Sequence, residues 1–197
     1  MSERTARIAR TTKETDIELS IDLDGTGTTD IETGIGFFDH MLTAFGRHGL
    51  FDLSVRAKGD LEVDGHHTVE DVGIVAGQAF ASALGDKRGI RRFGSIALPM
   101  DEALILAAID ISGRGQLFWE ADVPAVMVGS FDATLAKEFF IAFAANAGVT
   151  LHIRELAGEN THHVIEGMFK AVARAMRQAV EADPRMGDAL PTTKGAL

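Results

Sequence analysis

The feature that most constrains this fold is a five-residue motif, His-His-x-x-Glu, that occurs twice. The copies begin at residues 66 and 162, which places them 96 residues apart. In each half an aromatic pair near a helix start, a glycine, an alternating strand and a polar loop precede the motif, and a long helical pattern follows it. This period is too long for a solenoid repeat, whose units span roughly 20–50 residues. The chain is therefore expected to fold as two similar halves.

Alternation of polar and apolar residues predicts half-buried strands, whereas apolar spacing of three and four residues predicts helices. The expected strands are 5–10, 16–23, 50–57, 95–99, 103–111, 115–122 and 149–155. The expected helices are 36–45, 68–84, 133–147 and 162–182. Strand 103–111 is apolar enough to be buried on both faces, Gly46 and Gly49 are expected to end the first helix, and Asp132 is the candidate N-cap of the third.

These elements predict an α+β fold in which each half is a small, mostly antiparallel sheet with two helices on one face. The first half would span residues 1–90 and the second 91–185. Residues 186–197 belong to neither copy and would form a C-terminal tail that carries a lysine.

Composition limits the chemistry of the chain. The sequence has no cysteine, so any metal must be held by histidine and carboxylate, which suits manganese, iron or zinc. A formal net charge of −10 argues against a nucleic-acid partner, because affinity for phosphate backbones comes from lysine and arginine. No apolar run approaches the roughly 18 residues of a membrane span, and a cytoplasmic location is expected.

The two motifs have the geometry of metal ligands. On a helix, residues i and i+4 share a face, whereas neighbours i and i+1 point about 100° apart. Each first histidine can therefore share an ion with the glutamate, while each second histidine must face another partner. Two metal centres that draw histidines from both copies are expected, and buried or capping histidines are the alternative. The candidate ligands are His66, His67, Glu70, His162, His163 and Glu166.

Other polar residues leave two interpretations open. His40 follows an aromatic pair and an aspartate, which fits either a ligand or a core or capping histidine. His48 and His152 are interpreted as structural or surface residues. Basic residues punctuate turns of the second half and the tail, where they could grip phosphate or simply be solvated. They are Arg88, Arg91, Arg92, Arg114 and Lys194.

Four segments together resemble the imidazoleglycerol-phosphate dehydratase family of histidine biosynthesis. They are GFFDHML at 36–42, GHHTVED at 65–71, GENTHH at 158–163 and PTTKG at 191–195. The resemblance covers nearly the whole chain and implies a ribosomal protein S5 domain 2-like fold, with the helices packed between two sheets. It also implies two Mn²⁺ ions per active site, active sites at subunit interfaces and a homo-oligomer of 24 subunits. With no phosphatase domain, the chain resembles the monofunctional form.

The resemblance assigns roles position by position. His40, His67, His162 and Glu166 match the ligands of one manganese, and His66, Glu70 and His163 match those of the other. Glu138 stands where many relatives have a histidine ligand, and it stays a candidate because carboxylate can replace imidazole at manganese. Glu14 matches an acid/base near the substrate. The phosphate-gripping set is matched by Arg92, Arg114, Thr193 and Lys194.

The implied reaction is the loss of water from D-erythro-imidazole glycerol phosphate to give imidazole acetol phosphate. The proton to be removed lies on a carbon with no neighbouring carbonyl, so the imidazole ring must serve as the electron sink. The hypothesis is a metal-stabilised imidazolate and a diazafulvene-like intermediate, with Glu14 or a metal-bound hydroxide as base. Two alternatives remain at this point: a dinuclear metallohydrolase, and a non-enzymatic assembly held together by metal.

Overall fold

The computed structural model describes residues 4–195 and residue 197 of the chain. Residues 1–3 of the expected first half and Ala196 of the expected tail lie outside the described residues. The strands are β1 Thr5–Thr11, β2 Thr15–Asp22, β3 Thr29–Glu32, β4 Asp52–Gly59, β5 Phe93–Met100, β6 Ala103–Asp110, β7 Gln116–Glu120, β8 Met127–Val128, β9 Phe131–Asp132 and β10 Thr150–Ala157. The helices are α1 Gly36–Gly49, α2 His66–Leu84, α3 Leu135–Ala147 and α4 Thr161–Val180.

The predicted duplication is visible in the two larger sheets. One has the strand order β1-β2-β4-β3 and the other β5-β6-β10-β7. In each, the first three strands pair antiparallel and the last strand pairs parallel to its neighbour. The two halves therefore share strand order and direction, which confirms the α+β class predicted from the sequence.

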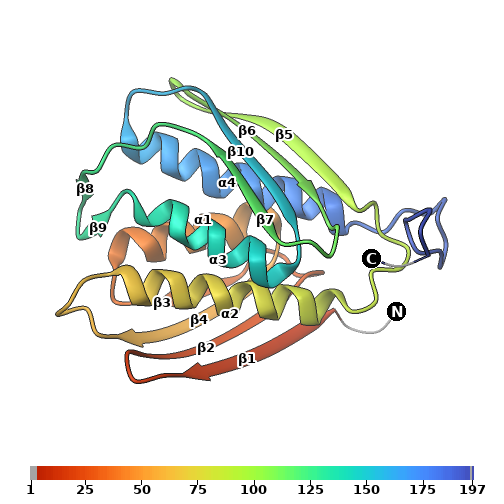
Figure 1. The fold of residues 1–197 in the computed structure, drawn as a ribbon, viewed down its shortest axis with the longest axis horizontal. Coiled ribbons are helices and arrows are strands. Elements are labelled where there is room, and N and C mark those ends of the chain that lie inside the picture. The colour runs from red at the N-terminus through yellow and green to blue at the C-terminus, as the bar shows by residue number, and fades with distance from the viewer. Residues whose placement is uncertain (1–3, 196) are drawn as a thin grey trace.

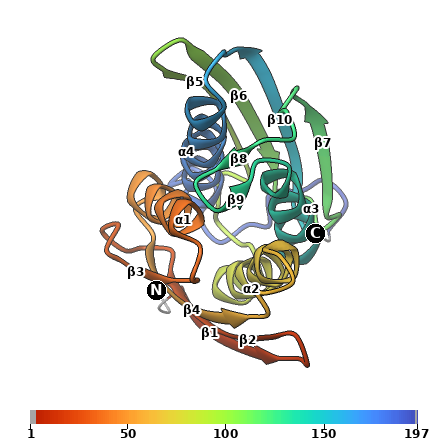
Figure 2. The same ribbon diagram turned by 90° about the vertical axis from the view of Figure 1, so that its left-hand side faces the viewer.

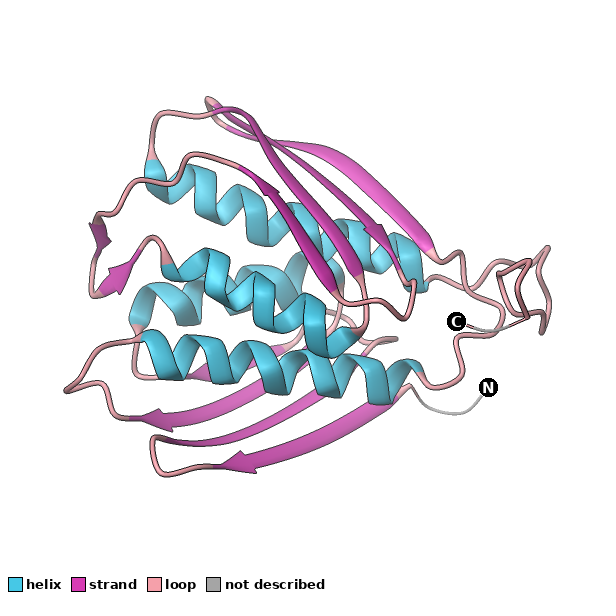
Figure 3. Cartoon of the chain, viewed as in Figure 1, coloured by secondary structure: helices cyan, strands magenta, loops and turns pink. Residues whose placement is uncertain are grey.

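The four helices lie between the two sheets, which form the outer layers of the molecule (Figures 1 and 3). The end-on view shows α2 over the first sheet and α4 under the second (Figure 2). Inward residues of the strands are apolar, as in β2, where Ile17, Leu19 and Ile21 are buried against the helices. Burying apolar surface between the layers is the main stabilising contribution to such a fold.

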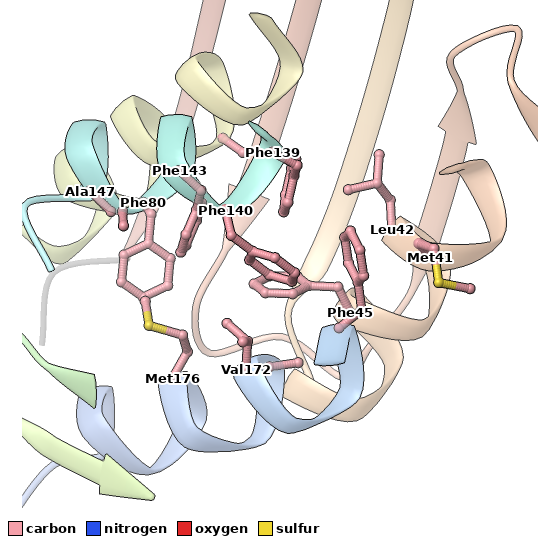
Figure 4. Close-up of a cluster of buried hydrophobic side chains, with 14 of the residues drawn as sticks. Met41, Leu42, Phe45, Phe80, Phe139, Phe140, Phe143, Ala147, Val172 and Met176 are labelled. Atoms are coloured by element: carbon pink, nitrogen blue, oxygen red, sulfur yellow. The ribbon is translucent and has the colours of Figure 1, made fainter. Parts of the chain in front are cut away.

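All four helices contribute side chains to one core. Phe45 of α1, Phe80 of α2, Phe143 of α3 and Met176 of α4 converge in its centre (Figure 4). The ring centroids of Phe45 and Phe143 are 5.9 Å apart, as are those of Phe80 and Phe143. The duplicated halves are thus joined through their helices.

Three local expectations differ from the structure. Helix α1 continues through Gly46 and ends at Gly49, so only the second of the two expected glycines ends it. Gly46 lies against β3, where a built Cβ atom would stand 2.5 Å from the Thr29 side chain. Strand β6 buries Ile105 but leaves its outward neighbours half-buried, so the expectation of burial on both faces is wrong for a sheet covered on one side. Thr134 is the N-cap position of α3, and the Asp132 carboxylate accepts a hydrogen bond from its backbone N–H at 2.9 Å.

All four helices begin at the same end of the molecule. Helices α2, α3 and α4 begin beside β8 and β9, and the C-terminal residues lie at the opposite end (Figure 1). Helix α1 begins at the same end as the others, because the Phe37 ring lies 5.3 Å from that of Phe131 in β9. Among the described helices, none combines the length and apolar character that crossing a bilayer requires.

Candidate metal centre

The clearest cluster of potential ligands lies where α1 and α4 begin. The nearest ligand atoms of His40, His162 and Glu166 all lie within 4.8 Å of one another. Nε2 of His162 is 3.0 Å from Glu166 Oε2, and Nε2 of His40 is 3.4 Å from the same oxygen. The cluster therefore combines the second copy of the motif with His40, which lies in α1 of the first half.

Local structure explains why these side chains meet. Asn160 caps α4, with its side-chain oxygen accepting a hydrogen bond from the backbone N–H of His162 at 2.9 Å. The Phe37 ring packs edge-on against the His162 ring at a centroid distance of 5.0 Å and lies 6.5 Å from the His40 ring. Helix capping and aromatic packing thus restrict the orientation of both imidazoles.

The Glu166 carboxylate is buried, with 6% of the residue exposed. Lys170, one turn further along α4, binds its Oε1 at 2.6 Å, which leaves Oε2 to face the two imidazoles. Burial works to raise the pKa of Glu166, but the hydrogen bond and charge of Lys170 and the nearby His40 outweigh it, so the pKa is lowered. Glu166 is therefore an anion at neutral pH.

In the first copy of the motif, as in the second, the first histidine lies near the glutamate and the second histidine points elsewhere. His66 Nε2 lies 3.9 Å from Glu70 Oε2, one helical turn away. The rings of His66 and His67 stand at 89° to each other, and those of His162 and His163 at 81°. Adjacent histidines therefore point in different directions, as their helical spacing predicts.

His67 faces a carboxylate pair from the first half. Its Nδ1 lies 3.0 Å from Asp60 Oδ2 and 3.9 Å from Glu14 Oε2. The hydrogen bond with Asp60 raises the pKa of His67. The turn that carries Glu14 is fixed to the same loop, because the Asp60 N–H donates to the Glu14 carbonyl at 3.1 Å.

His163 faces the turn between β5 and β6. Its Nδ1 is 2.7 Å from Glu102 Oε2, and its Nε2 is 3.8 Å from Asp101 Oδ2. The hydrogen bond with Glu102 raises the pKa of His163, and the same bond together with backbone N–H groups lowers the pKa of Glu102 to about 2.

The residues of the cluster at His40 fit a divalent cation. Two imidazoles and one ionised carboxylate form a nitrogen and oxygen donor set without thiolate, which suits manganese, iron or zinc. Three protein ligands leave further coordination positions for substrate. Among residues 4–195 and 197, one group of at least three histidines or carboxylates has all its ligand atoms within 4.8 Å of one another, and it consists of His40, His162 and Glu166.

The other predicted ligands are not brought to that cluster within one chain. His67 lies with Asp60 and Glu14, while His66 pairs with Glu70. Glu138 lies in the first turn of α3 and is half-buried, and the start of this helix meets the start of α2 through Leu135 and Gly65.

The predicted phosphate residues gather at the opposite end of the molecule. Arg92 forms a bidentate pair with Asp110 at 2.7 and 3.1 Å, and its Nη1 donates to the carbonyl of Pro191 at 2.8 Å. This contact fixes the tail that carries Thr193 and Lys194. Arg114 donates to the Ser112 carbonyl at 3.2 Å, and the neighbouring Gly113 lies against the C-terminal residue.

Sequence reasoning missed Lys170, Asp60 and Glu102, whose side chains contact the side chains of candidate metal ligands. Lys170 could have been found, because it follows Glu166 by four residues and so shares its helix face. Asp60 and Glu102 reach their histidines from a loop and a hairpin turn. The contact of Glu102 spans 61 residues, and that of Asp60 spans seven but depends on the shape of the loop before α2, so no periodicity in the sequence marks either.

Comparisons with known proteins all give the same family. The sequence model described as imidazoleglycerol-phosphate dehydratase matches residues 33–176. The imidazoleglycerol-phosphate dehydratase of Acidiphilium cryptum is 64% identical over 98% of this chain and 99% of its own length, and that of Roseobacter denitrificans is 61% identical over 98% and 100%. The crystal structure of the Staphylococcus aureus dehydratase superposes with a TM-score of 0.82 at 41% identity, covering 91% of this chain and 99% of that one.

The duplicated α+β fold, its histidine and glutamate cluster and these relatives define a hydro-lyase. A Pyrococcus furiosus structure also superposes with a TM-score of 0.82, at 38% identity over 96% of this chain and all of that one. The chain belongs to the imidazoleglycerol-phosphate dehydratase family.

Proposed function

We propose that this chain removes water from D-erythro-imidazole glycerol phosphate to give imidazole acetol phosphate, a step of histidine biosynthesis, with two Mn²⁺ ions in each active site. The observation that carries the proposal is the grouping of His40, His162 and Glu166 in a member of the dehydratase family. When bound, a divalent cation would supply Lewis-acid stabilisation of negative charge on the imidazole ring.

The chain's own residues divide the remaining work. His40, His67, His162 and Glu166 are proposed to hold one ion, and His66, Glu70, His163 and Glu138 the other. Glu14 would take the proton from the carbon that becomes the enol carbon. Its side chain is 54% exposed and lies 3.9 Å from His67, so it is free to meet a substrate beside a ligand. Arg92, Arg114, Thr193 and Lys194 would bind the phosphate.

One chain does not hold all these residues around one small substrate. The backbone N–H of Arg92 donates to the carbonyl of Ala179, near the end of α4, whereas His162 lies at its start. At about 1.5 Å per residue the two positions are roughly 25 Å apart. The substrate is much shorter, so complete sites require a second copy of the chain. This supports active sites at subunit interfaces, and 24 subunits and a cytoplasmic location stay predictions.

Metal removal tests the proposal. Dialysis against a chelator should abolish formation of imidazole acetol phosphate, and added Mn²⁺ should restore it, because the ring loses its electrophilic partner. A rigorously metal-free sample that kept full activity would contradict the proposal.

Measuring phosphate release beside imidazole acetol phosphate formation distinguishes the dehydratase from the two alternatives, a metallohydrolase and a non-enzymatic assembly held together by metal. A metallohydrolase would release inorganic phosphate without forming an enolisable ketone. A purely structural metal would hold the particle together without any substrate-dependent activity.

A further inference from the structure

The two hairpin turns beside the motifs carry equivalent glutamates with different surroundings. Glu14 directly precedes β2 in the first half, and Glu102 directly precedes β6 in the second. Each lies beside the second histidine of its half, Glu14 at 3.9 Å from His67 and Glu102 at 2.7 Å from His163. The duplication has therefore placed one carboxylate at each of two similar corners.

At the second corner both carboxylate oxygens are in use. Oε1 of Glu102 accepts hydrogen bonds from the backbone N–H groups of Glu159 at 3.3 Å and Asn160 at 2.9 Å. Oε2 accepts from Nδ1 of His163 at 2.7 Å. One side chain thus fixes the loop that enters α4 and the imidazole that follows it.

At the first corner another residue fills this role. The loop before α2 spans residues 60–65, whereas the loop before α4 spans only 158–160. The longer loop supplies Asp60, whose carboxylate meets Nδ1 of His67 at 3.0 and 3.2 Å. The shorter loop contributes its backbone N–H groups to Glu102, and the carboxylate that meets His163 comes from the hairpin turn.

We propose that Glu102 is a positioning residue that keeps the proton of His163 on Nδ1 and so leaves Nε2 free for a metal ion. An ionised carboxylate can only accept a hydrogen bond, so the neutral imidazole beside it carries its proton on Nδ1. Ligating histidines commonly donate their second ring nitrogen to such a partner, and losing the partner costs about 10–100-fold in metal affinity or activity. The inference rests on the proposed function, in which His163 is a ligand.

Glu102→Gln distinguishes the effect of Glu102 on the His163 proton from its support of the loop before α4. The glutamine carbonyl can still accept from the loop N–H groups, but its amide NH₂ donates to Nδ1 and moves the imidazole proton to Nε2. In the full-length assembled protein, Mn²⁺ binding followed by the electron paramagnetic resonance signal of free Mn²⁺ should show one class of site weakened about 10–100-fold. The other class should keep its wild-type affinity. Glu102→Ala should weaken the same class.

Asp101→Asn is the matched control, because it removes the same charge from the same turn at 3.8 Å from Nε2. It should bind Mn²⁺ as the wild type does. The inference would be overturned if Glu102→Gln bound Mn²⁺ as the wild type does, or if Asp101→Asn lost as much affinity as Glu102→Gln. It would also be overturned if Glu102→Gln weakened both classes of site and lowered the thermal unfolding midpoint, because that would indicate general damage to the fold. A wild type that binds no Mn²⁺ would overturn the proposed function and the inference with it.

Discussion

At the scale of single residues, Glu14 and Glu102 show how similar corners can serve different purposes. The Glu102 carboxylate accepts from His163 and two backbone N–H groups. Among the described residues, no hydrogen bond donor reaches the Glu14 carboxylate, and its nearest ionisable neighbour of basic type is His67 at 3.9 Å. A free carboxylate beside a candidate ligand can exchange protons with a substrate, whereas a fully hydrogen-bonded one is better suited to holding its neighbours.

Glu14→Gln tests the proposed proton transfer. The amide has the shape of the carboxylate but cannot take a proton, so kcat should fall about 100-fold or more. Mn²⁺ content measured by elemental analysis should stay unchanged. Glu18→Gln is a suitable control, since this residue of β2 pairs with Arg7 on the outer face of the sheet. An unchanged rate in Glu14→Gln would remove Glu14 from the mechanism.

The candidate site was predictable from sequence only where contacts are local. Helical spacing places His162 beside Glu166 and turns His163 away, and the structure has both features. The approach of His40 from α1 and of Glu102 from a distant hairpin depends on how the layers pack. Periodicity within one segment contains no information about such packing.

At the scale of secondary-structure elements, the close approach of α2 and α3 joins the two halves. A Cβ atom built at Gly77 would stand 2.7 Å from both the carbonyl oxygen of Phe143 and the Asn146 Cβ atom. At Gly73 it would stand 2.8 Å from the carbonyl oxygen of Phe139. The helices can therefore lie this close only because these positions lack side chains.

Gly77→Ala should lower the stability of the protein. Overpacking costs about 1–3 kcal/mol. Two of the atoms closest to the built Cβ, Phe143 O and Ala147 N, belong to the backbone and cannot easily yield, so the cost should exceed the gain of about 1 kcal/mol that alanine brings within a helix. The thermal unfolding midpoint should fall by about 2–4 °C for each kcal/mol lost. Gly36→Ala is the control, because nothing lies within 4 Å of its built Cβ atom. Equal midpoints for both variants would show that α2 and α3 separate at little cost.

Asp52 couples the start of β4 to the turn before β3 in a pH-dependent way. Its Oδ1 accepts from the backbone N–H groups of Thr26 and Thr28, both at 2.8 Å, and the bond from Thr28 is the largest cause that lowers the pKa of Asp52. The stabilisation is therefore complete above the ordinary pKa, about 3.8, and is lost as pH falls through the lower folded value. Urea unfolding should show a smaller loss of stability on acidification below pH about 4 in Asp52→Asn than in the wild type.

Most elements were predictable because their inward faces alternate or repeat regularly. Strand β3 was missed because Thr29–Glu32 is short and its partner β4 lies beyond a helix in the sequence. Strand β6 reads as doubly buried because Leu104, Leu106 and Ala108 face outward beside buried neighbours. A sequence pattern indicates how apolar one face of a strand is. Whether another layer covers that face depends on how all the elements pack.

At the scale of the whole molecule, the central claim is that each active site combines opposite ends of two chains. Candidate metal ligands cluster where α1 and α4 begin, whereas Arg92 and the tail lie beyond the end of α4. This separation within one chain is the reason for proposing active sites built from two copies, which a symmetric homo-oligomer would bring together.

Complementation between inactive variants tests this claim most directly. His162→Ala damages the ligand end and Lys194→Glu damages the phosphate end, so each homogeneous protein should be inactive. If sites combine two chains, co-expression in equal amounts should leave both ends intact in about a quarter of the sites and restore about that share of wild-type activity. A co-expressed protein no more active than its parents would contradict the claim, because it would mean that each chain builds its own complete site.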